Sequence, residues 1–259
     1  MPPLRLAILE ADIPVPQTHQ KYHGYLGVFA HLLQQALPPS QPLSSILTLT
    51  GHDVVTAGAA RPDSPPYPLL DSIDAILISG SKHNAFDNEP WIVNLVSFVQ
   101  KALEKGIKVV GICFGHQILA RALSTPVGRA DAGWEVSVTP TQLTPAGQKI
   151  FGTDRQTLYL QQMHRDQVFG VPDGAELLAS SDKCPNHGFW IPGKVLTVQG
   201  HPEFTAEIMR EILDLRKEAG IFPEGVYESG VERNGDHHDG VLVAKAILRF
   251  LQEDSPADN

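Results

Sequence analysis

The chain has 259 residues and a mass of 28.2 kDa, a size that suits one large α/β domain or two small ones. Charged residues make up 19% of it, which excludes a disordered polyelectrolyte, and a net charge of −9 argues against non-specific binding to nucleic acid or anionic membranes. Two cysteines are too few for a disulfide scaffold, and the N-terminal apolar run is too short for a secretory signal or a membrane span. We therefore expect a globular, cytoplasmic protein that binds neither nucleic acid nor membranes.

Short apolar runs alternate with helical patterns over the first half of the chain. The runs predict buried strands, and apolar residues at helical spacing predict the helices between them. This alternation is typical of βαβ units, so we expect a doubly wound α/β fold whose mainly parallel sheet has helices on both faces. The strands are expected at residues 5–9, 45–49, 73–79 and 107–112, and the helices at 22–37, 91–104 and 114–123.

The second half of the chain is expected to be rich in β-structure. Helices follow at 205–218 and 241–252, and the polar tail from 253 to 259 is expected to fray. We expect a single domain over 1–259, with a core at about 4–209 and a C-terminal helical extension at 210–252. The additional strands are expected at 134–138, 157–160, 176–180, 187–191 and 195–199.

The stretch Gly111-Ile112-Cys113-Phe114-Gly115 has the pattern of a nucleophile elbow. It follows a predicted strand and opens a predicted helix, and in such a turn the central residue is exposed above the sheet. The positive end of the helix dipole favours the thiolate of Cys113, and the N–H of Phe114 is free to point at an oxyanion. Cys113 is therefore the candidate nucleophile.

A cysteine nucleophile needs a base and a group that orients this base. Among the eleven histidines, His201 stands out because it follows the predicted strand 195–199, at the strand end where ligands of open α/β sheets bind. Glu203, two residues further on, could accept a hydrogen bond from the imidazole and fix its tautomer. Together these residues predict a Cys-His-Glu triad.

The two motifs Gly-Ile-Cys-Phe-Gly-His-Gln and Gln-Gly-His-Pro-Glu-Phe together resemble the class I, or triad-type, glutamine amidotransferases, which have a flavodoxin-like fold. The resemblance spans roughly Leu4 to Met209, and it is specific because both motifs occur in one chain. It implies Cys113 as the nucleophile, His201 as general base and acid, and Glu203 as the orienting carboxylate. No metal and no cofactor are implied.

The resemblance also implies an oxyanion site and a substrate site. The turn containing Gly80 and Ser81 is similar to the family's oxyanion strand, and its N–H groups would join that of Phe114. The residues implied to contact substrate are Gln117, His164, Arg165 and Asp166. Two residues depart from the family pattern: Ser81 replaces a glycine of the oxyanion turn, and Arg165 replaces a glycine of the substrate loop, which changes the pocket wall.

Synthases of this family join the amidase to a synthetase domain, but only about 50 residues follow Met209 and the sequence contains no G-x-x-x-x-G-K-[ST] loop. The chain is thus similar to freestanding members such as the plant γ-glutamyl peptidases, and hydrolysis of the γ-glutamyl amide of glutamine or of a γ-glutamyl peptide is implied. One alternative is a glutaminase subunit that delivers ammonia to a separate synthetase partner. Another is an inactive regulatory subunit with the same fold.

The run Asp236-His237-His238-Asp239 invites comparison with a metal site. Adjacent residues point in different directions and no flanking ligand has helical spacing, so we expect a solvated loop instead, with Asp239 as the N-cap of the last helix. Cys184, which precedes Pro185, has no partner motif and is expected to be inert.

Overall fold

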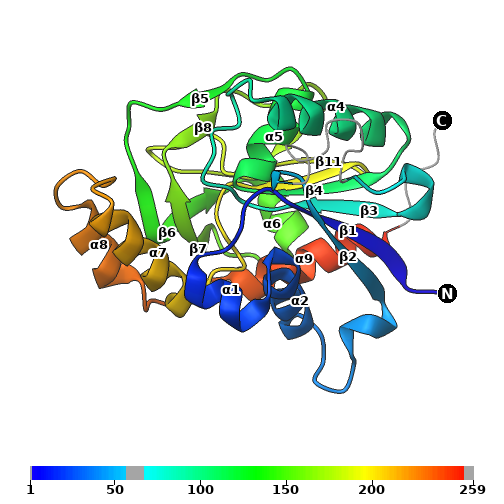
Figure 1. Ribbon diagram of the computed structural model, residues 1–259, viewed down its shortest axis with the longest axis horizontal. Helices are drawn as coiled ribbons and strands as arrows, with labels where there is room; N and C mark the ends of the chain where they lie inside the picture. The colour runs from blue at the N-terminus through cyan, green and yellow to red at the C-terminus, as the bar shows by residue number, and fades with distance from the viewer. Residues whose placement is uncertain (1, 57–66, 254–259) are drawn as a thin grey trace.

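A central sheet crosses the computed structural model, which describes residues 2–56 and 67–253 (Figure 1). In this part of the chain the sheet has seven strands. They are β1 (Leu4–Glu10), β2 (Leu47–Asp53), β3 (Ala75–Ile78), β4 (Lys108–Ile112), β9 (Glu176–Leu177), β11 (Phe189–Ile191) and β12 (Val195–Val198). Their order is β2-β1-β3-β4-β12-β11-β9, in which the first five strands pair in parallel and β11 pairs antiparallel with both of its neighbours.

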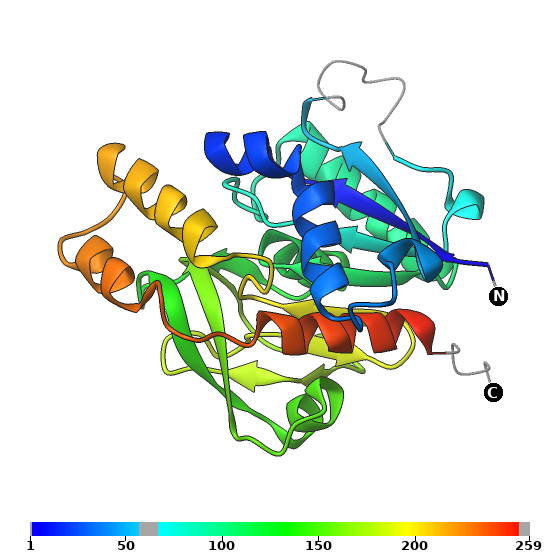
Figure 2. The same cartoon turned by 90° about the horizontal axis from the view of Figure 1, so that it is seen from below.

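Helices cover both faces of this sheet, as Figures 1 and 2 show from two directions. Helices α2 and α9 lie side by side on one face, and α4 and α5 pack together on the other. The α-helices of the described residues are α1 (Pro16–Tyr22), α2 (Tyr25–Gln35), α4 (Pro90–Glu104), α5 (Phe114–Ala122), α6 (Pro145–Phe151), α7 (Ala206–Glu218), α8 (Val226–Arg233) and α9 (Gly240–Gln252). The doubly wound, mainly parallel arrangement is therefore confirmed.

Apolar side chains of the central strands point alternately to the two faces of the sheet, so both faces must be covered by helices. On β1, Leu6 and Ile8 belong to the apolar cluster under α2 and α9, whereas Ala7 and Leu9 belong to the cluster under α4 and α5. Successive side chains of a strand point to opposite faces, so a strand with four consecutive apolar residues is buried on both sides.

The second half of the chain is rich in β-structure, as the sequence predicted, and part of it forms antiparallel sheets beside the central one. A long hairpin of β6 and β7 carries β10 at one edge, and β5 pairs with β8 in a separate two-stranded sheet. Helices α7 and α8 pack together, with α8 against β6 (Figure 1). The bounds of these strands are β5 (Val127–Arg129), β6 (Glu135–Leu143), β7 (Thr157–His164), β8 (Asp166–Val168) and β10 (Ala179–Ser180).

The helix expected at 22–37 is α2, which begins only at Tyr25, and Tyr22 is instead the last residue of the separate helix α1. His23 has φ 60° and Gly24 has φ 124°, and a helix cannot continue through such left-handed positions. The preceding α1 is mostly polar, so it carries no apolar periodicity that would have revealed it. The predicted start of the helix was wrong because the apolar residues Tyr22 and Tyr25 keep helical spacing across the break at residues 23 and 24.

Other elements also differ from expectation, among them β5 and β8, which the sequence did not predict. Residues 176–180 form two short strands rather than one, because β9 pairs with β11 in the central sheet and β10 pairs with β6. Helices α6 and α8 were not predicted. In α8 the buried Gly230 packs so closely that a Cβ there would lie 2.8 Å from the side chain of Leu213, so this helix depends on its neighbour α7 more than on an apolar stripe.

Helix α7 runs without a break across Met209, where the core was expected to end. The division into core and extension stays a prediction, and the expected frayed tail lies outside the described residues apart from Glu253. Asp239 does stand at the N-cap of α9, but its carboxylate accepts hydrogen bonds from Arg155 at 2.7 Å and from the N–H of Tyr159 at 2.8 Å rather than from the helix.

No helix within residues 2–56 and 67–253 combines the length and the apolar character needed to cross a membrane.

Candidate active site

Cys113 lies in a strained turn between β4 and α5. Its φ of 52° and ψ of −100° place a non-glycine residue in a sparsely populated region, which costs about 1–3 kcal/mol. A Cβ on Gly111 would lie 2.6 Å from the carbonyl oxygen of Gly115, and a Cβ on Gly115 would lie 2.4 Å from the carbonyl oxygen of Ile78. The two glycines thus let strand and helix approach closely enough to hold Cys113 in this turn, as the sequence predicted.

His201 and Glu203 follow β12, which is the strand beside β4. The N–H of Cys113 donates to the carbonyl of Val198 at 2.9 Å, so the elbow is tied to the end of β12. His201 Nδ1 lies 2.7 Å from Glu203 Oε1, and the imidazole stacks on Phe204 with ring centroids 3.9 Å apart. These contacts fix the imidazole in both position and orientation.

Gly80 shows how close the imidazole and the thiol lie. A Cβ on Gly80 would come within 2.6 Å of His201 Cε1 and 3.7 Å of Cys113 Cβ. Both side chains therefore border the same small space beyond the end of β3. The structure brings the three residues of the expected triad together, all of them buried.

The charge on His201 is set by its two neighbours. Burial by itself would lower the pKa of His201, but the negative charges of the Glu203 carboxylate and of the Cys113 sulfur raise it well above its ordinary value. The imidazolium form is thereby favoured at neutral pH, and an imidazolium can give a proton to a leaving amine.

The three residues expected to form the oxyanion site lie around the same space. Phe114 is the first residue of α5, so its N–H is among those that a helix leaves without an intrahelical partner. Its ring is held by stacking on Trp91, with centroids 5.6 Å apart. Gly80 and Ser81 follow β3, and Ser81 lines the pocket next to Cys113. The three expected oxyanion residues are thus found around the thiol.

Two glutamine amides form a chain that ends at the sulfur. Gln117 Nε2 donates to Gln199 Oε1 at 3.0 Å and to the carbonyl of Asp166 at 3.0 Å. Gln199 Nε2 in turn donates to Cys113 Sγ at 3.5 Å. Gln117 was expected at this site, whereas Gln199 was missed. The sequence signals for it were its place at the start of the motif Gln-Gly-His-Pro-Glu-Phe and its spacing of two residues from His201.

A pocket of about 600 Å³ opens from Cys113 and His201. Arg165 and Arg216 line it, and both guanidinium groups lie over the ring of Trp134, with the carbon atoms 5.4 and 5.1 Å from its centroid. Neither guanidinium forms an ion pair among the described residues, and the buried Nε of Arg165 has no hydrogen-bond partner there. Arg216 was not predicted, because α7 reaches this pocket only through the tertiary fold.

The other expected substrate residues also line the pocket, but each lies against a polar group of the protein. Asp166 forms an ion pair with Arg129, and His164 Nε2 lies 3.1 Å from Glu135 Oε2. Of the three loop residues 164–166, Arg165 is thus the one whose side-chain charge is left for a ligand.

Comparison with known proteins agrees with this geometry. Residues 51–215 match the family model described as glutamine amidotransferase class-I. A glutamine amidotransferase-like protein of Schizosaccharomyces pombe is 37% identical over 250 residues, which cover 96% of this chain and 98% of that protein. Gamma-glutamyl peptidase 3 of Arabidopsis thaliana is 38% identical over 150 residues, which cover 56% of this chain and 60% of the peptidase.

A solved structure shows the same fold. A glutamine amidotransferase from Thermotoga maritima superimposes with a TM-score of 0.72 over 96% of this chain and 99% of its own, at 18% identity. The fold and the elbow define an α/β protein built around a cysteine at the carboxyl edge of a parallel sheet. The chain belongs to the class I glutamine amidotransferase family.

Proposed function

We propose that this protein is a cysteine hydrolase of γ-glutamyl amide bonds, with Cys113, His201 and Glu203 as its triad. The single observation that carries the proposal is the strained Cys113 elbow beside an imidazole that Glu203 holds at 2.7 Å. Strain of this kind persists only where the surrounding structure maintains it, and it is concentrated at active sites.

The geometry supports a double-displacement reaction. The sulfur of Cys113 bonds to the γ-carbonyl carbon, and the N–H groups of Phe114 and Ser81 stabilise the resulting oxyanion. His201 gives a proton to the amide nitrogen as the C–N bond breaks, which releases the amine and leaves a γ-glutamyl thioester. Water then attacks the thioester with His201 as the base, so that glutamate leaves and the thiol is restored.

The pocket favours a γ-glutamyl peptide over glutamine as the substrate. The amine that leaves from such a peptide carries a carboxylate at its far end, and Arg165 and Arg216 are cations without an anionic partner among the described residues. Guanidinium groups bind carboxylates through paired, charge-assisted hydrogen bonds. Similarity to gamma-glutamyl peptidase 3 supports the same choice.

The test is to incubate the purified protein alone with glutathione and, separately, with glutamine. We expect release of cysteinylglycine from glutathione to be faster than release of ammonia from glutamine, and we expect Cys113→Ser to abolish both. Fast ammonia release without peptide cleavage would instead support the subunit that serves a separate synthetase.

Labelling separates a different substrate from an inactive site. 6-Diazo-5-oxo-norleucine should modify the peptide that contains Cys113, as seen by mass spectrometry. If Cys113 stays unmodified under conditions that label a known amidotransferase, and neither substrate turns over, the regulatory-subunit alternative would be favoured.

A further inference from the structure

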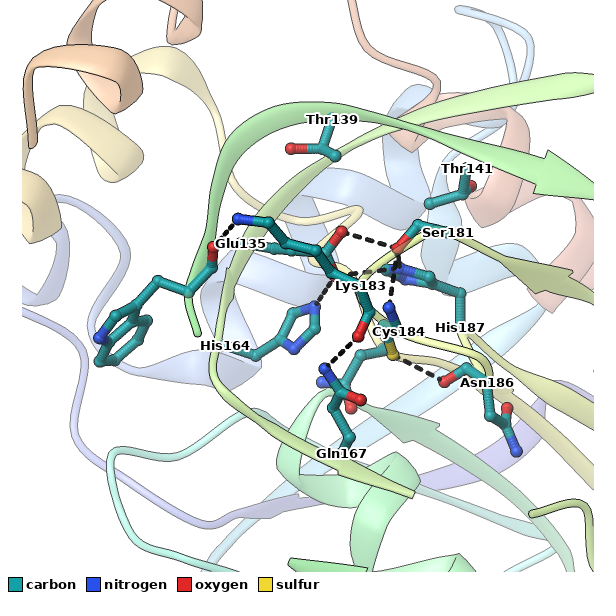
Figure 3. A network of polar contacts seen from close by, with 12 residues as sticks. Glu135, Thr139, Thr141, His164, Gln167, Ser181, Lys183, Cys184, Asn186 and His187 are labelled. Atoms are coloured by element: carbon teal, nitrogen blue, oxygen red, sulfur yellow. Dashed lines mark hydrogen bonds and ion pairs between the residues drawn. The ribbon is translucent and has the colours of Figure 1, made fainter. Parts of the chain in front are cut away.

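Four side chains with metal-ligating atoms, none of them from the triad, converge in one cluster (Figure 3). Glu135 begins β6, His164 ends β7, and Cys184 and His187 lie in the loop between β10 and β11. One potential ligand atom from each lies within 4.8 Å of all the others. The four residues are 5%, 4%, 0% and 4% exposed, respectively, so the cluster is closed to solvent.

The carboxylate of Glu135 faces both imidazoles of this cluster, and His187 Nε2 also lies 3.1 Å from Ser181 Oγ. Glu135 Oε2 lies 3.1 Å from His164 Nε2 and 3.2 Å from His187 Nε2. At these distances neither Glu135 Oε2 nor His164 Nε2 has the alignment of a hydrogen bond, and both atoms are buried. Buried polar groups without hydrogen bonds are costly, so a missing ligand is a natural explanation for them.

We propose that Glu135, His164, Cys184 and His187 form a four-coordinate binding site for a divalent cation of the zinc type.

The donor set selects this class of ion. One sulfur, two imidazole nitrogens and one carboxylate oxygen suit zinc, whereas magnesium and calcium prefer oxygen alone. Tetrahedral zinc with bonds of about 2.0–2.2 Å to nitrogen and oxygen separates these ligands by about 3.4 Å. The observed separations of 3.1 and 3.2 Å between Glu135 Oε2 and the two imidazoles are close to this value.

Charge balance also favours a divalent ion. Cys184 now donates its thiol proton to the carbonyl of Asn186 at 3.4 Å, and this proton would leave to solvent as the thiolate bonds to the metal. A 2+ ion, one thiolate, one carboxylate and two neutral imidazoles sum to zero charge. Neutrality matters here because an uncompensated charge is expensive to bury.

The surrounding loop is already organised for this role. The hydroxyl of Ser181 donates to Glu135 Oε1 at 2.8 Å and accepts from the N–H of Cys184 at 3.0 Å (Figure 3). Hydrogen bonds of this kind around the ligands orient them for a metal. Because four protein ligands leave no open position, the ion would be structural, joining β6, β7 and the loop directly behind Arg165 of the pocket wall.

The test is the metal content of the purified chain, measured by inductively coupled plasma mass spectrometry after exposure to zinc and then dialysis. We expect about one zinc ion per chain, lost in Cys184→Ala and kept in Cys113→Ala, the matched variant of the other cysteine. Absence of zinc from the wild type would overturn the proposal. So would zinc retained by Cys184→Ala, or zinc lost from Cys113→Ala, which would place the ion at the triad.

Cobalt keeps the proposal testable even if Cys184→Ala does not fold. The wild-type chain loaded with Co²⁺ should show a thiolate-to-cobalt charge-transfer band, and Cys113→Ala should show the same band. A Co²⁺ spectrum without thiolate character would overturn the site. Neither measurement uses a substrate, so failure here is distinguishable from failure of the proposed hydrolase activity.

Discussion

Replacing Gly115 by alanine tests the close approach on which the elbow depends. A Cβ at Gly115 would lie 2.4 Å from the carbonyl oxygen and 2.8 Å from the Cβ of Ile78, whereas ordinary van der Waals contact begins at 3.4 Å. The overlap of about 1 Å is with β3 itself and not with a flexible side-chain end, so α5 and β3 must move apart. Overpacking of this kind costs about 1–3 kcal/mol of unfolding free energy.

The measurement is thermal and urea unfolding of Gly115→Ala beside Gly235→Ala. A Cβ at Gly235 meets nothing within 4 Å, and this residue does not have a positive φ, so we expect its variant to stay within about 0.5 kcal/mol of the wild type. For a chain of this size each kcal/mol lost corresponds to about 2–4 °C in Tm.

Activity provides the second readout of the same variant. Because Cys113 stands at the N-terminus of α5, a displaced helix moves the sulfur away from His201, and turnover of a γ-glutamyl substrate should fall in Gly115→Ala but not in Gly235→Ala. Unchanged stability together with unchanged turnover in Gly115→Ala would refute the claim that the elbow requires this contact.

Three further predictions concern charge and reactivity. Glu203→Gln removes the carboxylate that raises the pKa of His201, so the imidazolium loses its proton at lower pH and the alkaline limb of the kcat profile should move to lower pH. Iodoacetamide at pH 8 should alkylate Cys113, which lines the pocket, but not Cys184, because burial raises the pKa of the Cys184 thiol to about 12. Mass spectrometry of the two cysteine-containing peptides measures this difference. Arg216→Met should raise KM for glutathione about 10–100-fold, which corresponds to the free energy of one charge-assisted hydrogen bond. KM for glutamine should stay nearly unchanged, because glutamine has no second carboxylate for Arg216 to bind.

Local sequence was sufficient for the elbow and for the parallel sheet. Gly111 and Gly115 flank Cys113 in the chain, and the steric limits that require glycine act between residues a few positions apart or on the adjacent strand. The apolar run of β1 could be read from the sequence, because its four buried residues, 6 to 9, lie between covered faces and are all apolar. His201 and Glu203 could be paired in advance because only one residue separates them.

Groups that meet from distant segments were decided by the tertiary structure. Arg216 reaches Trp134 only because the fold brings α7 to the segment before β6. Glu135 faces His164 because the antiparallel register of β6 and β7 makes them direct partners. A strand's register and a helix's docking are set by the sum of many contacts, and no short run of residues encodes that sum. The sequence by itself therefore determined the elbow and the type of sheet, while the shape and charge of the pocket wall depended on how the whole chain packs.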